Sequence, residues 1–125
     1  MAANDFNLAL QEHLNSIKNR DINTFAKFFS PHHSAIVILP NGTKIEGNDE
    51  IIDFHKQWFE DADWHMETKT VDCFVVENMG YALLDVEYKD MDEDGKPYQM
   101  SYFLSMIFMK TEDRWILLRD QNTLK

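Results

Sequence analysis

The chain has few of the residues that would cross-link it, embed it in a bilayer or attach it to a polyanion. Cys73 is the only cysteine among 125 residues, which excludes an internal disulfide and a cysteine-based zinc site. The 12 Lys and Arg are outnumbered by 22 Asp and Glu, and the formal charge of −10 disfavours nucleic acid and anionic membranes as partners. The longest nearly apolar run, 103–109, is too short to span a bilayer.

What remains is the composition of a globular domain. Apolar residues make up 44% of the chain and aromatic residues 13%, which is enough to build a packed core. No repeat, low-complexity tract or linker divides the sequence, so residues 1–125 are expected to form a single domain. The first residues lack the basic and apolar segments of a secretion signal, so we expect a cytoplasmic protein.

Periodicity predicts helices at the start of the chain and a meander of strands after them. Helical spacing covers 5–20, 21–29 and 48–61, with Asp5 expected to cap the first helix. Strands are expected at 34–39, 43–46, 66–77, 81–91, 97–110 and 114–121. Asn41-Gly42 predicts a tight hairpin. This order indicates an α+β fold rather than a parallel βαβ fold.

Two histidines lie in the middle of apolar helix stripes. His13 falls between Leu10 and Leu14 on the first helix, and His55 follows Ile51 on the third. Both imidazoles should therefore point at the sheet and not at water. In one interpretation each is a core histidine satisfied by a backbone carbonyl or a water. In the other, both face one cavity, close enough for a direct or water-bridged hydrogen bond.

The last strand carries a carboxylate among apolar residues. Alternation places Ile116, Leu118, Asp120 and Asn122 on one face. If that face meets the helices, Asp120 lies in the wall of an apolar pocket, where burial raises its pKa and suits it to general acid or base catalysis. The alternative is a solvated strand end, or a pair with Arg119 or another cation.

The segment 97–110 is apolar on both faces of its predicted strand. A strand buried on both sides needs a second cover beyond the helices of its own domain, and another subunit can supply one. We therefore expect a homodimer that buries at least about 1,200 Å² in a sheet-to-sheet interface.

Three motifs together support a family resemblance. They are Arg20-Asp21 between the first two helices, Pro40-Asn-Gly-Thr-x-x-x-Gly-x-x-x-Ile-x-x-Phe54, and Trp115-x-x-x-x-Asp-Gln-Asn-Thr123. In their order and spacing, the chain resembles the nuclear transport factor 2-like superfamily, and within it the SnoaL-like polyketide cyclases and ketosteroid isomerases. The resemblance implies a cone-shaped, curved antiparallel sheet packed on N-terminal helices, as in the cystatin-like roll, with an open apolar pocket and usually a homodimer.

The resemblance also suggests site residues. The two isomerase tyrosines fall on His13 and His55, whereas the general-base aspartate falls at about Leu39 and the protonated aspartate at about Ser105. Ketosteroid isomerisation by that mechanism is therefore not expected. The expected catalytic residues are His13, His55 and Asp120. The expected ligand-binding residues are Trp58, Phe59, Leu84, Val86, Tyr88, Phe103, Ser105, Leu118 and Asn122.

Two functions stay open. One is an isomerase, cyclase or dehydratase that binds a small, mainly apolar molecule and transfers a proton next to a carbonyl. The other is a non-catalytic homodimeric association or ligand-binding module. No cofactor and no metal are expected. The acidic turn 90–95 imitates an EF-hand loop but has Ser101 where glutamate is required, and His32, His33 and His65 lack a recognised ligand spacing.

Overall fold

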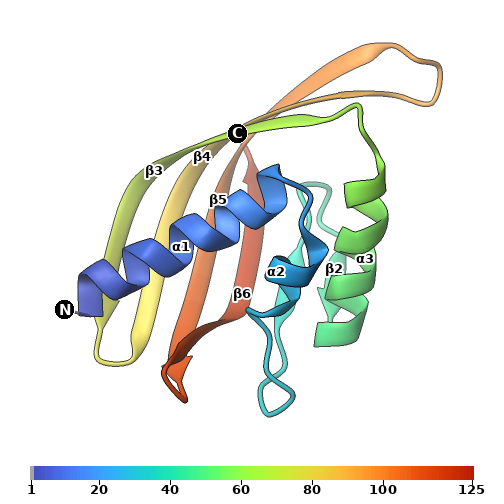
Figure 1. Cartoon of the computed structure of the whole chain (residues 1–125). Helices are drawn as coiled ribbons and strands as arrows, with labels where there is room; N and C mark the ends of the chain where they lie inside the picture. Colours follow the sequence, from blue (N-terminus) through green and yellow to red (C-terminus); the bar gives the residue numbers. More distant parts are fainter. Residues whose placement is uncertain (1) are drawn as a thin grey trace.

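The computed structural model describes residues 2–125, with helices and strands arranged as in Figure 1. The predicted α+β fold class is confirmed by the order of helices and strands. The first helix begins earlier than predicted, so Asp5 lies in its first turn and does not cap it, and the second helix is shorter. The elements are α1 (Ala2–Lys18), α2 (Ile22–Ala26), β1 (Ile36–Ile38), β2 (Lys44–Glu46), α3 (Asn48–Glu60), β3 (His65–Val76), β4 (Met79–Met91), β5 (Pro97–Thr111) and β6 (Arg114–Leu124).

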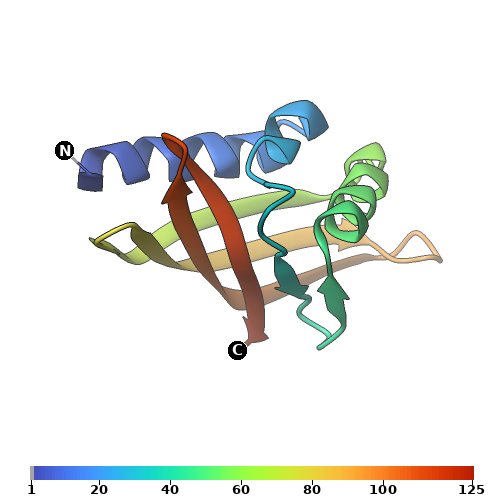
Figure 2. The same ribbon diagram turned by 90° about the horizontal axis from the view of Figure 1, so that it is seen from below.

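The six strands form one curved sheet in the order β2-β1-β6-β5-β4-β3. All neighbouring pairs are antiparallel except β1 and β6, which are parallel. The helices cover one face of this sheet: α1 crosses the long strands, and α3 lies beside β1 and β2 (Figures 1 and 2). Within residues 2–125, no helix lies on the other face. This arrangement is the predicted curved sheet packed on N-terminal helices.

The inner face of the sheet is the core, and alternation along β4 and β5 decides which residues reach it. Ala82, Leu84 and Val86 of β4 are fully buried, as are Met106 and Phe108 of β5. The residues between them turn to the outer face, where they are only partly covered. The predicted parity of β4 is therefore confirmed.

Gly80 shows how closely α1 lies on the sheet. A Cβ atom at Gly80 would be 2.5 Å from the Phe6 ring, so only glycine allows this approach. The Phe6 ring is itself fully buried and packs edge-on against Phe108 and next to Trp115. This contact fixes the first half of α1 over β4, β5 and β6.

One prediction for β6 is wrong because the strand contains a β-bulge. Phe108 pairs with Leu117 and the preceding Ile107 with Arg119, so Leu118 has no partner on β5. An extra residue inverts the alternation on one side of it. Asp120 still shares the inner face with Met106, its partner, but Leu117 takes the inward place that alternation alone gave to Leu118.

Two polar side chains, Arg20 and Asn48, connect the two ends of α3 to neighbouring segments of the chain. Arg20, in the turn after α1, donates to the carbonyl oxygens of Asp61 (3.1 Å) and Trp64 (2.6 Å). Asn48, at the start of α3, accepts from the Ala35 amide and donates to two carbonyl oxygens of the segment before β1. Both ends of α3 are thereby fixed to neighbouring chain segments. Among the described residues, no helix combines the length and apolar character that a bilayer crossing requires.

Candidate functional site

A cavity of about 470 Å³ lies between α3, the β1–β2 hairpin and the inner face of the sheet. Five of the residues expected at a site line it, namely His55, Trp58, Tyr88, Asp120 and Asn122. The remaining lining residues are Ile17, Val37, Leu39, Pro40, Asn41, Phe54, Met66, Tyr98, Met100, Tyr102 and Leu104. The wall is mostly apolar and aromatic, and no Lys or Arg belongs to it.

Asp120 is the one carboxyl group among the residues that line the cavity. It is 7% exposed, and this burial raises its pKa to about 7. The Asn122 side chain donates to Asp120 Oδ1 at 3.1 Å, a hydrogen bond that lowers the pKa but only partly offsets the burial. No ion pair with Arg119 forms within residues 2–125, where the Arg119 guanidinium instead donates to the Leu118 carbonyl.

His55 contributes a neutral imidazole to the same wall. Its Nδ1 lies 2.7 Å from the Ile51 carbonyl oxygen, which can only accept, so Nδ1 carries the proton and Nε2 is an acceptor. Burial lowers the pKa of His55 to about 4, although the hydrogen bond to Ile51 favours the charged form. At neutral pH the cavity therefore contains a basic nitrogen without a positive charge.

His13 does not line the cavity. Its ring is fully buried among Phe25, Phe28 and Phe108, and neither ring nitrogen has a hydrogen-bond partner within residues 2–125. Burial lowers its pKa to about 3, and the neighbouring His55 contributes in the same direction.

The predicted sharing of one cavity by His13 and His55 is wrong. Phe25, from α2, stacks against both rings, with centroid distances of 5.3 Å to His13 and 4.3 Å to His55. The two histidines thus belong to one aromatic stack but have different surroundings. Sequence periodicity placed both on inward faces correctly, but it could not show that a short helix supplies a ring that packs on each.

Several expected ligand-binding residues lie outside the cavity lining. Phe59, Leu84 and Val86 are buried, but they fill the core. Phe103 and Ser105 point to the outer face because they alternate with Tyr102 and Leu104, and Leu118 is the bulge residue. The expected site included Phe103 and Ser105 and missed Tyr102 and Leu104, which line the cavity. Alternation along β5 separates these two pairs, and Tyr102 and Leu104 are on the inward face of the strand.

At one end the cavity wall is a connected aromatic group. Trp58 Nε1 donates to the Tyr88 hydroxyl at 3.1 Å, and the Tyr88 hydroxyl donates to Asp90 Oδ2 at 2.7 Å. The Tyr98 hydroxyl reaches the same carboxylate oxygen at 3.5 Å. Tyr98 is 41% exposed, so the cavity reaches the surface at this end, which we call the mouth. Burial, followed by the hydrogen bond to Asp90, holds the pKa of Tyr88 well above its usual value.

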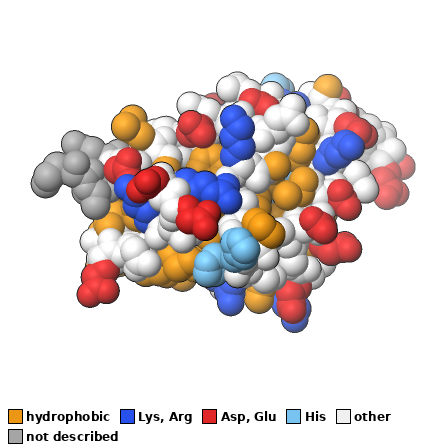
Figure 3. All heavy atoms as spheres, turned by 60° about the horizontal axis from the view of Figure 1, so that its bottom comes forward, with side chains coloured by type: hydrophobic (Ala, Val, Ile, Leu, Met, Phe, Trp, Pro, Cys, Tyr) orange, Lys and Arg blue, Asp and Glu red, His pale blue; other side chains and the backbone are white. Residues whose placement is uncertain are grey.

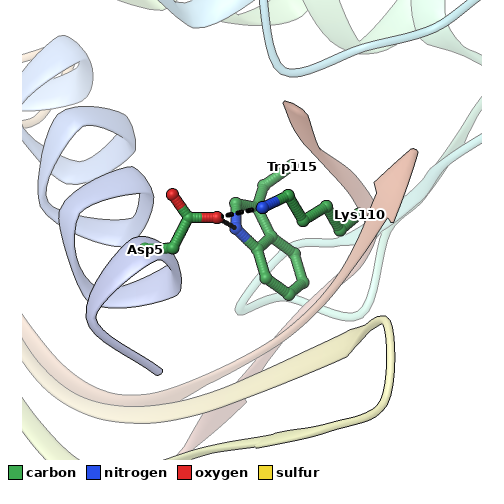
Figure 4. A network of polar contacts seen from close by, with 3 residues as sticks. All are labelled: Asp5, Lys110 and Trp115. Carbon is green, nitrogen blue, oxygen red and sulfur yellow. Dashed lines mark hydrogen bonds and ion pairs between the residues drawn. The ribbon is translucent and has the colours of Figure 1, made fainter. Parts of the chain in front are cut away.

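A second hollow, of about 450 Å³, lies over α1 and the β5–β6 turn. Here the Asp5 carboxylate pairs with Lys110 and accepts a hydrogen bond from Trp115 Nε1 at 3.2 Å (Figure 4). The hydrogen bond from Lys110 lowers the pKa of Asp5, and the bond from Trp115 adds to this. The three side chains link the first turn of α1 to the sheet, and we assign them a structural role.

The curved sheet, the helices on one face and the cavity between them are the features of a nuclear transport factor 2-like fold. The sequence profile of the SnoaL-like domain matches residues 7–121, and the chain belongs to this family. A comparison with curated protein sequences finds no match.

Solved structures share the fold at low sequence identity. A ketosteroid isomerase-like protein from Erwinia carotovora atroseptica superposes with a TM-score of 0.80 at 13% identity, over 98% of this chain and 95% of that one. A nuclear transport factor 2-like superfamily protein from Salmonella enterica serovar Typhimurium gives 0.74 at 18%, over 98% and 89%. The association domain of CaMKII from C. elegans gives 0.66 at 20%, over 95% and 92%.

Proposed function

We propose that this protein binds a small, mainly apolar molecule in the cavity and transfers a proton next to a carbonyl group, as an isomerase, cyclase or dehydratase. The observation that carries the proposal is the Asp120 carboxyl group in an apolar wall. Because its pKa lies at about 7, it can both take up and release a proton near neutral pH. The cytoplasmic location expected from the sequence stays a prediction.

The groups around Asp120 suggest separate roles. Asp120 acts as the general base and acid, and Asn122 orients it through the hydrogen bond to Oδ1. The Tyr102 hydroxyl has only a weak partner, the Met66 sulfur at 3.9 Å, and its pKa is raised by burial and then by the charge of Asp120. It is free to turn and donate to a developing oxyanion beside the base. His55 Nε2 accepts from a ligand hydroxyl. His13 has no role in this set.

Hydrogen exchange into a model ketone tests the reaction. In D₂O, 2-tetralone should exchange its α-hydrogens faster with the wild-type protein than with Asp120→Asn, by roughly 10²–10⁴-fold. Asp113→Asn is the matched control, because it makes the same substitution at a residue that is exposed in the β5–β6 turn. Equal exchange by wild type and Asp120→Asn would show that Asp120 does not act on the ligand.

The outer face of the sheet supports a second candidate, a homodimeric association module. Apolar side chains are neighbours across three strands there: Phe74 packs on Tyr81, Tyr81 pairs with Ile107, and Met79 pairs with Met109. Phe74 is 49% exposed although it is large and apolar. A second copy of the chain would cover this area. The catalytic and association functions are compatible, because the cavity opens on the other side of the sheet.

A further inference from the structure

The mouth of the cavity has aromatic rings and acceptor oxygens but almost no free side-chain donor. Trp58 Nε1 is bound to Tyr88, and the hydroxyls of Tyr88 and Tyr98 are directed at Asp90. Elsewhere in the wall, the Asn122 amide is also committed, to Asp120 and to the Ile38 carbonyl oxygen. A carboxylate or phosphate ligand would need donors that these contacts already use.

The free polar groups of the wall are mainly acceptors. His55 Nε2 is an acceptor because Nδ1 holds the proton. Asp120 has one oxygen, Oδ2, that no donor within residues 2–125 reaches, and the residue is 93% covered by its surroundings. The Tyr102 hydroxyl and the exposed Asn41 amide are the side-chain exceptions. A ligand that brings its own donors or a positive charge matches this wall better than one that brings acceptors.

The charged side chains near the Tyr98 hydroxyl at the mouth are carboxylates, which also favour a cationic ligand. The carboxylates of Asp90, Asp61 and Asp92 all lie near enough to the Tyr98 hydroxyl to raise its pKa, after the larger effect of burial. No Lys or Arg lines the cavity, whereas acidic and basic side chains are interspersed on the face of the molecule drawn in Figure 3. A cation at this end would find a negative potential and aromatic rings, which attract ammonium groups through their quadrupoles.

A cation already lies on Trp64, a ring next to this aromatic group and outside the cavity lining. The Arg20 guanidinium lies 3.9 Å from the centroid of the Trp64 ring, and Trp64 stacks on Trp58 at 4.2 Å. Arg20 itself is held by the carbonyl oxygens of Asp61 and Trp64, outside the residues that line the cavity. Its charge is therefore not available to an anionic ligand in the cavity.

We infer that the ligand carries an organic ammonium group, which binds at the cavity mouth against Trp58, Tyr88 and Tyr98, with its apolar body directed toward Asp120. The inference rests on the proposed function and specifies the ligand class of that same cavity. In this arrangement Asp90 provides the counter-charge at the mouth, and Asp120 stays free to transfer a proton at the inner end.

Three water-soluble probes of similar size test the charge preference: 2-phenylethylammonium, 2-phenylethanol and 3-phenylpropionate. Binding is measured at about pH 8 and low salt by NMR titration, following the indole Nε1–H signal of Trp58. We expect the cation to bind roughly tenfold more tightly than the alcohol, and the anion to bind weakest. Asp90→Asn keeps an acceptor for both tyrosines and should remove most of the preference for the cation. Tyr98→Leu should reduce it as well.

Asp113→Asn is the matched control, since it changes the net charge by the same amount at the distant β5–β6 turn. If it weakens cation binding as much as Asp90→Asn does, the preference is a property of the whole acidic protein and the inference is wrong. If alcohol and cation bind equally, or the anion binds best, the inference is wrong while the proposed cavity function stands. If no probe binds or shifts the Trp58 signal, both fail together.

Discussion

Asn122 donates one amide hydrogen to Asp120 Oδ1 at 3.1 Å and the other to the Ile38 carbonyl oxygen at 2.7 Å. Ile38 belongs to β1, the strand that runs parallel to β6. The second bond therefore holds the Asn122 amide against this neighbouring strand. Among the residues that the structure describes, the carboxyl group is thus oriented by one neutral donor and by no cation. One such donor is too little to offset burial, and Asp120 is left with a pKa near neutrality.

This high pKa predicts that Asp120 costs stability at alkaline pH. The folded protein keeps the proton up to about pH 7, whereas the unfolded chain releases it near 3.8. The contribution of the protonated Asp120 carboxyl group to the free energy of unfolding is therefore fully present below about pH 4 and is lost as the pH rises to about 7. Asp120→Asn should be more stable than wild type at about pH 8, on the order of 2–4 kcal/mol, and similar to it near pH 4.

Chemical denaturation at several pH values measures this difference, with Asp113→Asn as the control for a lost exposed charge. A variant that is less stable than wild type at every pH would show that Asp120 makes a favourable ionic contact in the folded protein. The proposed proton transfer would then lose its basis.

His13 gives the opposite pH dependence. The folded protein keeps this ring neutral down to about pH 3, whereas the unfolded chain protonates it below about pH 6.5. The contribution of the neutral His13 ring to the free energy of unfolding is therefore fully present above pH 6.5 and is lost as the pH falls toward 3. His13→Phe fits a site bordered by three phenylalanine rings and should gain on wild type by about 2 kcal/mol between pH 7 and pH 5.

The measurement is the free energy of unfolding of both proteins across that range. Two curves that stay parallel would mean that the folded protein accommodates a charged imidazole at this position. Since His13 lies outside the cavity, binding of 2-phenylethanol should be the same in both proteins at pH 7.

The outer face predicts an effect on assembly. Ile107→Asp would place a carboxylate in the middle of the apolar area, between its partners Tyr81 and Arg119, and should convert the expected dimer to monomer at about 10 µM. Leu8→Asp is the control, because Leu8 is 72% exposed on α1, on the helical side of the sheet. Light scattering coupled to gel filtration gives the mass. A wild-type monomer, or equal loss of dimer in both variants, would contradict the expected interface.

Much of the fold could be predicted because local pattern and tertiary environment agree. The stripes on α1 and α3, the hairpin at Asn41-Gly42 and the alternation in β4 each have a short-range physical cause, and the structure follows them. Alternation along the last strand also predicted Asp120 on the inner face, and in the structure Asp120 pairs with the buried Met106 of that face.

Two features of the site could not be predicted, because each depends on contacts between distant segments. The bulge at Leu118 changes alternation in the last strand, and nothing in the apolar run 115–118 indicates it. The stacking of Phe25 on both His13 and His55 requires α2 to pack against α1 and α3 at once, and helical periodicity does not give that relationship.

The most direct measurement is a carboxyl titration of Asp120 by ¹³C NMR. The account predicts a midpoint near pH 7 in the free protein, well above the ordinary value for aspartate. Asn122→Ala removes the one donor to the carboxyl group, and its midpoint should be higher still. A midpoint near 4 in wild type would contradict the account, because it would show that the cavity wall does not desolvate the Asp120 carboxyl group.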